Sequence, residues 1–173
     1  MYRWISLACL ICTANPIGAQ SLLRFNENSF YKPPENPILR ADSNFVFMDP
    51  VKQRMVRWQQ ADVFNPAAIV RDGKVYLLYR CEDNPVAHLG GRTSRLGLAE
   101  STDGIHFTKY PQPVLYPTDD PFREYDDPGG CEDPRLVQTE DGLYVVAYTS
   151  WNQKIARLSI AFSRDLIHWE KKG

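Results

Sequence analysis

The sequence predicts an all-β fold, and three observations support this prediction. The 173 residues include 13 prolines, 10 glycines and 9 tyrosines, and long runs of Ala, Leu, Glu and Lys are nearly absent. Short segments alternate aromatic or β-branched residues with polar ones, and Asp-Gly pairs separate them, which is typical of strands joined by tight turns. These segments also recur along the chain.

The overall composition excludes several classes of protein. The chain is 43% hydrophobic and 12% aromatic, and its formal net charge is -1. Such a chain has neither the charge bias of a disordered segment nor the basic patch of a nucleic-acid binder. We therefore expect a globular domain without a nucleic-acid partner.

Residues 1–19 have the layout of a secretory signal peptide. Arg3 precedes an apolar run over 4–12, and small residues around Ala19 provide a cleavage site. The run is too short to cross a bilayer, so no membrane span is expected. The alternative is a buried N-terminal strand, but Pro16 interrupts that pattern. The prediction is a secreted or periplasmic protein.

Two cysteines, Cys81 and Cys131, remain after removal of such a signal. In an oxidising compartment they could form a disulfide, whereas two separate buried thiols fit the usual burial of cysteine. The sequence leaves both alternatives open. Neither cysteine has a second cysteine or a histidine at the spacing of zinc ligands, so no metal site is expected.

An internal repeat organises the chain. "FNPAAIVRDGKVYLLYR" at 64–80 matches "EDPRLVQTEDGLYVVAYT" at 132–149, with Asn65 and Asp133 at corresponding places before proline. "SRLGLAESTDGIHF" at 94–107 then matches "ARLSIAFSRDLIHW" at 156–169. The second half of the chain therefore repeats the structure of the first. His106 and His168 occupy equivalent positions, which favours a structural role for both.

Each repeat predicts four short strands. One pair surrounds the turn at Asp72 and Gly73, and the next surrounds Asp103 and Gly104. Repeated four-stranded sheets are typical of β-propeller blades, whose innermost strands begin at a central channel. Asn65 and Asp133 are then expected at one pocket. A β-sandwich is the structural alternative, but it does not explain why this polar step recurs in register.

Four motifs together resemble glycoside hydrolase family 130, the mannoside phosphorylases and β-mannosidases. They are "ENPIL" at 35–39, "VFNPAAIVRDGKVYLLYR" at 63–80, "GRTSRLGLAESTDGIHF" at 91–107 and "GGCEDPR" at 129–135. The resemblance implies a five-bladed β-propeller with the active site at one end of the channel. Five units of about 65 residues need roughly 325 residues. We therefore expect a signal peptide at 1–19, an N-terminal extension at 20–43, and a truncated propeller of two blades at 44–173.

The "GGCEDPR" stretch contains the predicted acid. Cleavage of a glycosidic bond needs a group that protonates the leaving oxygen. It also needs a second group that attacks the anomeric carbon or activates a water molecule that does so. Adjacent side chains on a strand point to opposite faces, so Glu132 and Asp133 are not expected to share a pocket. The resemblance implies that Asp133 is the general acid. The alternative is that Asp133 only caps the turn before Pro134.

The substrate-binding residues are also implied by the resemblance. Asn65 and Arg80 correspond to residues that bind the non-reducing mannose, and Arg95 lies near the aglycone or nucleophile side. Asp83 is a candidate by position alone, and Arg157 is a candidate on the phosphate or nucleophile side. The alternative for the three arginines is a structural ion pair, which for Arg80 involves Glu82 or Asp83.

The predicted function is that of an exported, inverting and exo-acting β-mannoside hydrolase, with β-1,2-linked mannosides as the expected substrate. One alternative is a phosphorylase that uses inorganic phosphate, since the nucleophile side is expected after Gly173. A second alternative is a fragment that binds sugar or is inactive. No cofactor is implied.

Overall fold

The computed structural model describes residues 32–173 except Leu89, and its compact unit spans Glu35–Gly173. The predicted signal peptide at 1–19 lies outside the described residues. The described end of the predicted N-terminal extension at 20–43 contacts the rest of the compact unit, since the backbone N–H of Asp42 donates to the carbonyl of Gln59 at 2.9 Å. No helix in the described part of the chain is long and apolar enough to cross a membrane.

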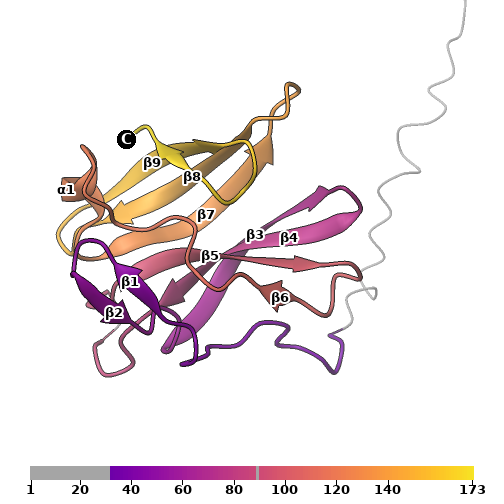
Figure 1. Ribbon diagram of the computed structural model, residues 1–173, viewed down its shortest axis with the longest axis horizontal. Helices are drawn as coiled ribbons and strands as arrows, with labels where there is room; N and C mark the ends of the chain where they lie inside the picture. Colours follow the sequence, from indigo (N-terminus) through magenta and orange to yellow (C-terminus); the bar gives the residue numbers. More distant parts are fainter. Residues whose placement is uncertain (1–31, 89) are drawn as a thin grey trace, which may run out of the picture. The chain divides into compact units, whose positions relative to one another are not determined.

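The prediction of an all-β fold is confirmed (Figure 1). In the described residues a single short helix, α1 (Arg123–Asp126), accompanies the strands. The strands are β1 (Phe47–Asp49), β2 (Arg54–Val56), β3 (Asp62–Arg71), β4 (Lys74–Glu82), β5 (Ser94–Ser101), β6 (Thr108–Lys109), β7 (Gly130–Gln138), β8 (Tyr144–Trp151), β9 (Ala156–Ser163) and β10 (Glu170–Lys171).

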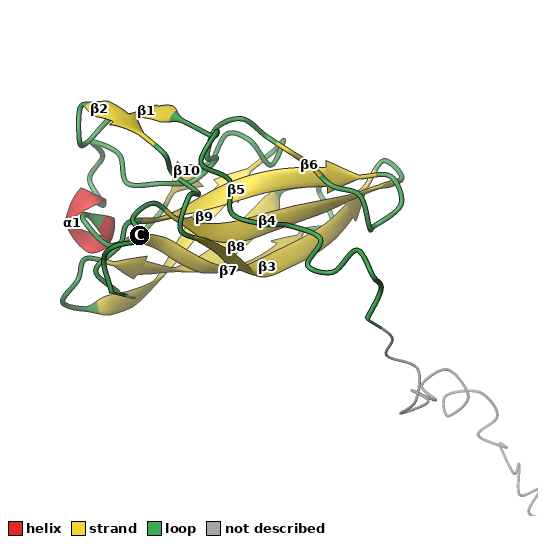
Figure 2. Cartoon of the chain, turned by 90° about the horizontal axis from the view of Figure 1, so that it is seen from below, coloured by secondary structure: helices red, strands yellow, loops and turns green. Residues whose placement is uncertain are grey.

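The repeat corresponds to two antiparallel four-stranded units. The first pairs β3 with β4, β4 with β5, and β5 with β6, and the second pairs β7 through β10 in the same order. A parallel contact between Ser94 and Gly130 joins the two units. The hairpin of β1 and β2 lies to one side of them (Figure 2). The units form an open arrangement rather than a closed ring.

The predicted Asp-Gly turns are confirmed. Asp72 and Gly73 have φ values of 50° and 75° and connect β3 to β4, as a tight hairpin turn with two left-handed residues requires. Gly104, between β5 and β6, has a φ of 76°. Glycine adopts these angles without steric cost, so each turn is determined locally by its own residues.

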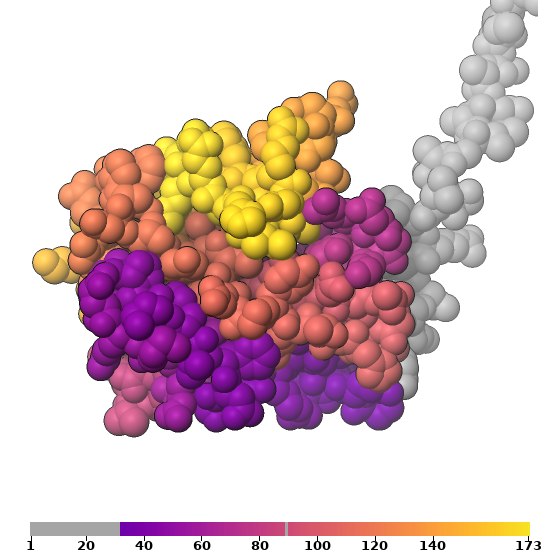
Figure 3. Space-filling view, viewed as in Figure 1, coloured from indigo at the N-terminus to yellow at the C-terminus, as the bar shows by residue number. Residues whose placement is uncertain are grey.

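Two hydrophobic clusters cover the two faces of the first unit. The cluster between the units includes Leu78, Leu96 and Tyr148, and the cluster beneath the β1–β2 hairpin includes Trp58 and Tyr79. Full burial of a side chain of this size stabilises the fold by about 1.5–3 kcal/mol. Figure 3 shows the N-terminal part of the compact unit, coloured indigo, packed along the first unit.

The two cysteines belong to different clusters. Cys81 packs beneath the β1–β2 hairpin, Cys131 packs between the units, and both are free and fully buried. The alternative of two separate buried thiols is therefore the one observed. Burial raises the pKa of both thiols, so neither ionises readily.

The outer face of the second unit is uncovered by the described residues. Val137 on β7 and Leu158 and Ile160 on β9 are exposed on this face. They lie beside the β8 side chains that alternate with the buried ones, on the same face of the sheet. Apolar side chains gathered on one sheet face are typical of a surface that packs against another element.

The equivalent histidines close equivalent turns. His106 Nδ1 lies 2.7 Å from Asp103 Oδ2, and His168 Nδ1 lies 2.6 Å from Asp165 Oδ2. Each aspartate also accepts hydrogen bonds from the backbone N–H of its histidine. The structural role predicted for both histidines follows from these contacts.

Replacing Asp103 with asparagine is expected to lower the pKa of His106. In the native turn the hydrogen bond to Asp103, with its charge, raises that pKa above the ordinary value. The raised pKa adds stability below about pH 6.5 that is lost as the pH rises through the folded value. An NMR titration of His106 measures the change. The control variant Asp72→Asn, at another exposed turn aspartate, should leave the midpoint in place, and equal shifts would contradict the assignment.

Candidate active site

The site forms where β3 and β7 each contain a bulge. Pairing shifts register between Phe64 and Ala67 on β3 and between Glu132 and Arg135 on β7. The residue before proline has a positive φ in both strands, 45° for Asn65 and 50° for Asp133. Asn and Asp adopt this region more readily than other side chains, and proline lacks the N–H that a regular ladder needs. The repeated polar-proline step therefore produces the same bulge twice.

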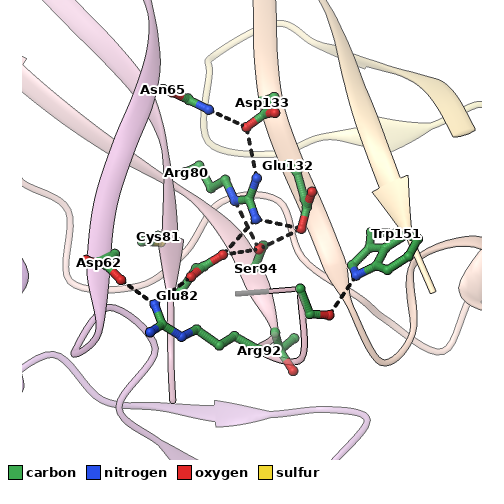
Figure 4. A network of polar contacts seen from close by, with 12 residues as sticks. Asp62, Asn65, Arg80, Cys81, Glu82, Arg92, Ser94, Glu132, Asp133 and Trp151 are labelled. Atoms are coloured by element: carbon green, nitrogen blue, oxygen red, sulfur yellow. Dashed lines mark hydrogen bonds and ion pairs between the residues drawn. The ribbon is translucent and has the colours of Figure 1, made fainter. Parts of the chain in front are cut away.

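The two bulges bring Asn65 and Asp133 together (Figure 4). Asn65 Nδ2 donates to Asp133 Oδ1 at 2.8 Å, although 68 residues separate them. The expectation that these residues meet is confirmed. Next to them is an open cavity of about 610 Å³, lined by residues 65–68 and 134–137. The site thus has both a polar pair and adjacent space.

Arg80 is the cation at the centre of this site. It comes from β4, and its Nη1 donates to Asp133 at 3.1 Å, while its Nη2 donates to Glu132 at 2.8 Å and to Glu82 at 2.7 Å. The guanidinium carbon lies 4.7 Å from the centre of the Phe64 ring, within reach of a cation–π interaction. One buried arginine therefore binds three carboxylates, including the Glu82 partner considered from the sequence.

The prediction that Glu132 and Asp133 point to opposite faces of the strand is wrong at this bulge. Both side chains bind Arg80, through its two terminal nitrogens. The alternation of side chains requires regular extended backbone, and the left-handed conformation at Asp133 interrupts it. The bulge thus directs two adjacent carboxylates to the same guanidinium.

The pKa values of the two carboxylates are shifted in opposite directions. Burial tends to raise the pKa of Asp133, but hydrogen bonds from Asn65 and Arg80 outweigh it and hold this pKa below its ordinary value. For Glu132, burial outweighs the opposing effect of Arg80, and the pKa is raised. Asp133 is also the more accessible group, since its side chain is 35% exposed against 13% for Glu132.

The glycines of "GGCEDPR" allow β7 to approach β5. A Cβ atom on Gly130 would lie 2.0 Å from the carbonyl oxygen of Ser94, and one on Gly129 would lie 2.2 Å from the Trp151 ring. Neither distance is sterically possible. The close approach lets Ser94 Oγ donate to Glu132 at 3.0 Å.

Asp83 and Arg95 belong to a separate ion-pair cluster. Arg95 is fully buried, and its Nη2 and Nη1 donate to Asp49 at 2.5 Å and to Asp83 at 3.1 Å. Lys52 binds Asp83 at 2.9 Å. Burial raises the pKa of Asp83, but Arg95 and Lys52 outweigh it and keep this pKa low.

This cluster corrects the predicted role of Arg95. A side chain without exposed surface cannot contact a sugar, so Arg95 follows the structural alternative. Asp83 lines a different cavity, of about 400 Å³, that also includes Lys52 and Thr93. The structure thus places neither residue beside Asp133.

Among the described contacts, Arg157 has no hydrogen bond or ion pair with the polar group around Asp133. Its guanidinium carbon lies 5.0 Å from the centre of the Tyr125 ring. Its role on the phosphate or nucleophile side stays a prediction.

Sequence reasoning missed Arg135. This exposed arginine lines the 610 Å³ cavity, and its positive charge helps to lower the pKa of Asp133. Its counterpart in the first unit is Ala67. A charged residue at a position where the repeat has alanine is the signal that could have identified it.

Comparison with known proteins finds several similar sequences. The family model for glycoside hydrolase family 130, described as beta-1,4-mannooligosaccharide phosphorylase, matches residues 30–173. A 1,2-beta-oligomannan phosphorylase from Thermoanaerobacter sp. (strain X514) is 41% identical over 67% of the chain and 38% of its own length. A beta-1,2-mannobiose phosphorylase from the same organism is 30% identical over 74% of the chain and 43% of its own length.

Solved structures show the same similarity. A putative glycosidase from Bacteroides thetaiotaomicron has a TM-score of 0.80 and 55% identity, over 83% of this chain and 41% of that one. A second structure, reported with glycoside hydrolases of family 130 that target beta-1,2 mannosidic linkages in Candida mannan, has a TM-score of 0.80 and 48% identity over 82% and 40%. The chain thus spans about two fifths of the length of these relatives.

Proposed function

Because the chain belongs to glycoside hydrolase family 130, a family of glycoside-processing enzymes, we propose that it is part of an enzyme that cleaves β-mannosides with Asp133 as the general acid. The two four-stranded units are the first two blades of a five-bladed propeller. The cavity beside Asn65 and Asp133 then belongs to the channel end that receives the sugar.

The observation that carries this proposal is the position of Asp133. Its carboxylate is held by Asn65 and Arg80 next to an open cavity, and it is more exposed than its neighbour Glu132. The raised pKa of Glu132 would favour that residue as proton donor. However, a proton donor must first reach its substrate, and Glu132 is the less exposed of the two carboxylates.

Binding of a sugar over the cavity raises the pKa of Asp133, which is low in the free site. Without substrate, Asp133 is held ionised, because its pKa is lowered. A sugar that covers the cavity removes water from this carboxylate, and desolvation raises the pKa of an acid. Protonation of Asp133 is then coupled to binding.

The binding residues follow from the cavity. Asn65 lines it and is therefore the residue that binds the non-reducing mannose directly. Arg80 is buried and is not among the residues that line the cavity, so it acts by holding Asp133 in place. Arg135, from β7, adds an exposed cation to the lining of the cavity. A guanidinium and a side-chain amide are suitable hydrogen-bond partners for sugar hydroxyl groups.

Hydrolysis of β-1,2-mannosides is the reaction we propose. It is supported by the 48% identity to a structure reported with hydrolases of that specificity. Export, predicted from residues 1–19, also favours hydrolysis, because a sugar phosphate made outside the cytoplasm is difficult to recover. Export itself stays part of this proposal.

Phosphorolysis is the second candidate, and a specific observation favours it. Both curated relatives described above are phosphorylases of β-1,2-linked mannosides. A phosphorylase needs cationic side chains that hold inorganic phosphate, and Arg157 is the predicted contributor in this chain.

The need for phosphate distinguishes the two reactions. We expect the full-length enzyme, extended past Gly173, to release mannose from β-1,2-mannobiose in a phosphate-free buffer. A strict requirement for phosphate, with mannose 1-phosphate as the product, would show that phosphorolysis is the reaction. Binding of the disaccharide without either product would support a sugar-binding role instead.

A further inference from the structure

Glu82 is a buried carboxylate directly beneath the proposed acid site. Its side chain is only 1% exposed. Arg80 Nη2 donates to Oε1 at 2.7 Å, and Arg92 Nη1 donates to Oε2 at 2.9 Å. Each carboxylate oxygen therefore binds a different arginine. Buried charges persist in proteins when they are paired in this way.

The two arginines connect Glu82 to opposite ends of one network (Figure 4). Arg80 extends to Asp133, while Arg92 extends to Asp62 at the surface and to the carbonyl of Ala87. The order of contacts is Asp62, Arg92, Glu82, Arg80, Asp133. Glu82 is thus the connection between the outer arginine and the arginine that holds the acid.

The contacts of Arg80 determine its orientation. Nε donates to Ser94 at 3.2 Å, Nη2 donates to Glu82 and Glu132, and Nη1 is left to face Asp133. A guanidinium is planar, so fixing one edge also fixes the direction of the other. Loss of Glu82 would leave Nη2 with Glu132 alone.

We propose that Glu82 is a positioning residue that acts on Asp133 through Arg80: it takes part of the positive charge of this arginine and so sets how strongly Nη1 stabilises the Asp133 carboxylate. This inference rests on the proposed role of Asp133 as the acid. Glu82 itself touches neither the cavity nor Asp133. It acts through Arg80.

The charge balance gives the expected direction of the effect. Asp133 is faced by Asn65 from β3, by Arg80 from β4, and by Glu132 and Arg135 from its own strand. When the negative charge of Glu82 is removed, more of the positive charge of Arg80 acts on Asp133, so the ionised carboxylate of Asp133 is stabilised. Removing the charge of Arg92 makes Glu82 compete more strongly for Arg80, so the carboxylate is destabilised.

Two variants with opposite expected signs test the proposal. The titration midpoint of the Asp133 carboxyl carbon is measured by NMR in the full chain, with Asp133→Asn to assign the signal. We expect Glu82→Gln to shift the midpoint downward and Arg92→Gln to shift it upward. Asp62→Asn, which removes an exposed charge from the far end of the network, is the matched control and should produce a smaller shift than either.

Each outcome is decisive. Unchanged midpoints in folded Glu82→Gln and Arg92→Gln, shifts of the same sign, or a control shift as large as theirs would overturn the proposal. If Glu82→Gln does not fold, the upward shift in Arg92→Gln decides alone, because that side chain is nearer the surface. The titration does not depend on turnover, so a failure of the proposed function is recognised separately, by an active Asp133→Asn enzyme.

Discussion

Replacing Asp133 with asparagine is expected to reduce turnover of β-1,2-mannobiose by about 10²–10⁴-fold in the full-length enzyme, because general acid catalysis typically contributes that much. Asparagine keeps the size of the side chain and can still accept the hydrogen bond that Asn65 donates. It cannot supply a proton to the leaving oxygen. The loss should therefore appear in kcat, with a smaller change in KM.

The matched control is Asp141→Asn. Asp141 lies in the turn of the same unit, and its side chain is 68% exposed and paired with Arg164. This variant should retain nearly full activity. An Asp133→Asn enzyme that turns over within a few-fold of the wild type would refute the assignment of the acid. Strong loss in both variants would point to a general effect on folding.

Replacing Arg80 with methionine is expected to destabilise the fold by about 3–5 kcal/mol, the usual cost of leaving buried charge uncompensated. Arg80 is the common partner of Glu82, Glu132 and Asp133. Without it these three carboxylates repel one another inside the sheet. Denaturant unfolding of the wild type and the variant at neutral pH measures the difference.

The destabilisation should become smaller at low pH. Loss of Arg80 removes an effect that lowers the pKa of Glu132, so the folded-state pKa rises further above the unfolded value. The folded state then binds more protons than the unfolded state, and stability falls as the pH rises. The difference between variant and wild type is thus expected to be largest near pH 7 and to decrease as the carboxyl groups protonate.

Arg164→Met is the matched control for this prediction. Arg164 is 65% exposed and forms a surface pair with Asp141, a type of contact that contributes about 0–1 kcal/mol. Equal destabilisation by the two arginine variants would show that Arg80 does not organise the carboxylates. A pH-independent difference for Arg80→Met would contradict the electrostatic origin of the effect.

The features predicted best are those that depend on neighbouring residues. The turns at Asp72 and Gly104 need only their own backbone angles, and both form as predicted. The repeat was equally informative, because one polar step before proline occurs twice. It predicted that Asn65 and Asp133 would meet, and they do.

The features predicted worst depend on contacts between distant segments. Arg95 is buried because the β1–β2 hairpin supplies Asp49, which lies 46 residues earlier in the chain. Nothing in the local sequence around Arg95 indicates that partner. Glu132 was placed on the wrong face because strand alternation was assumed through a bulge, and a one-residue irregularity reverses the direction of a side chain.

The sequence by itself determined the strands, the turns, the repeat and the polar pair before proline, since each follows from local backbone preferences and from periodicity. Only the tertiary structure decided which charges share a partner. Arg80, Glu82, Glu132 and Asp133 come from two strands in different units, and their hydrogen bonds exist only when β3, β4 and β7 lie side by side. The pKa shifts of these carboxylates are also decided only by the tertiary structure, because burial and charge partners are properties of the folded chain.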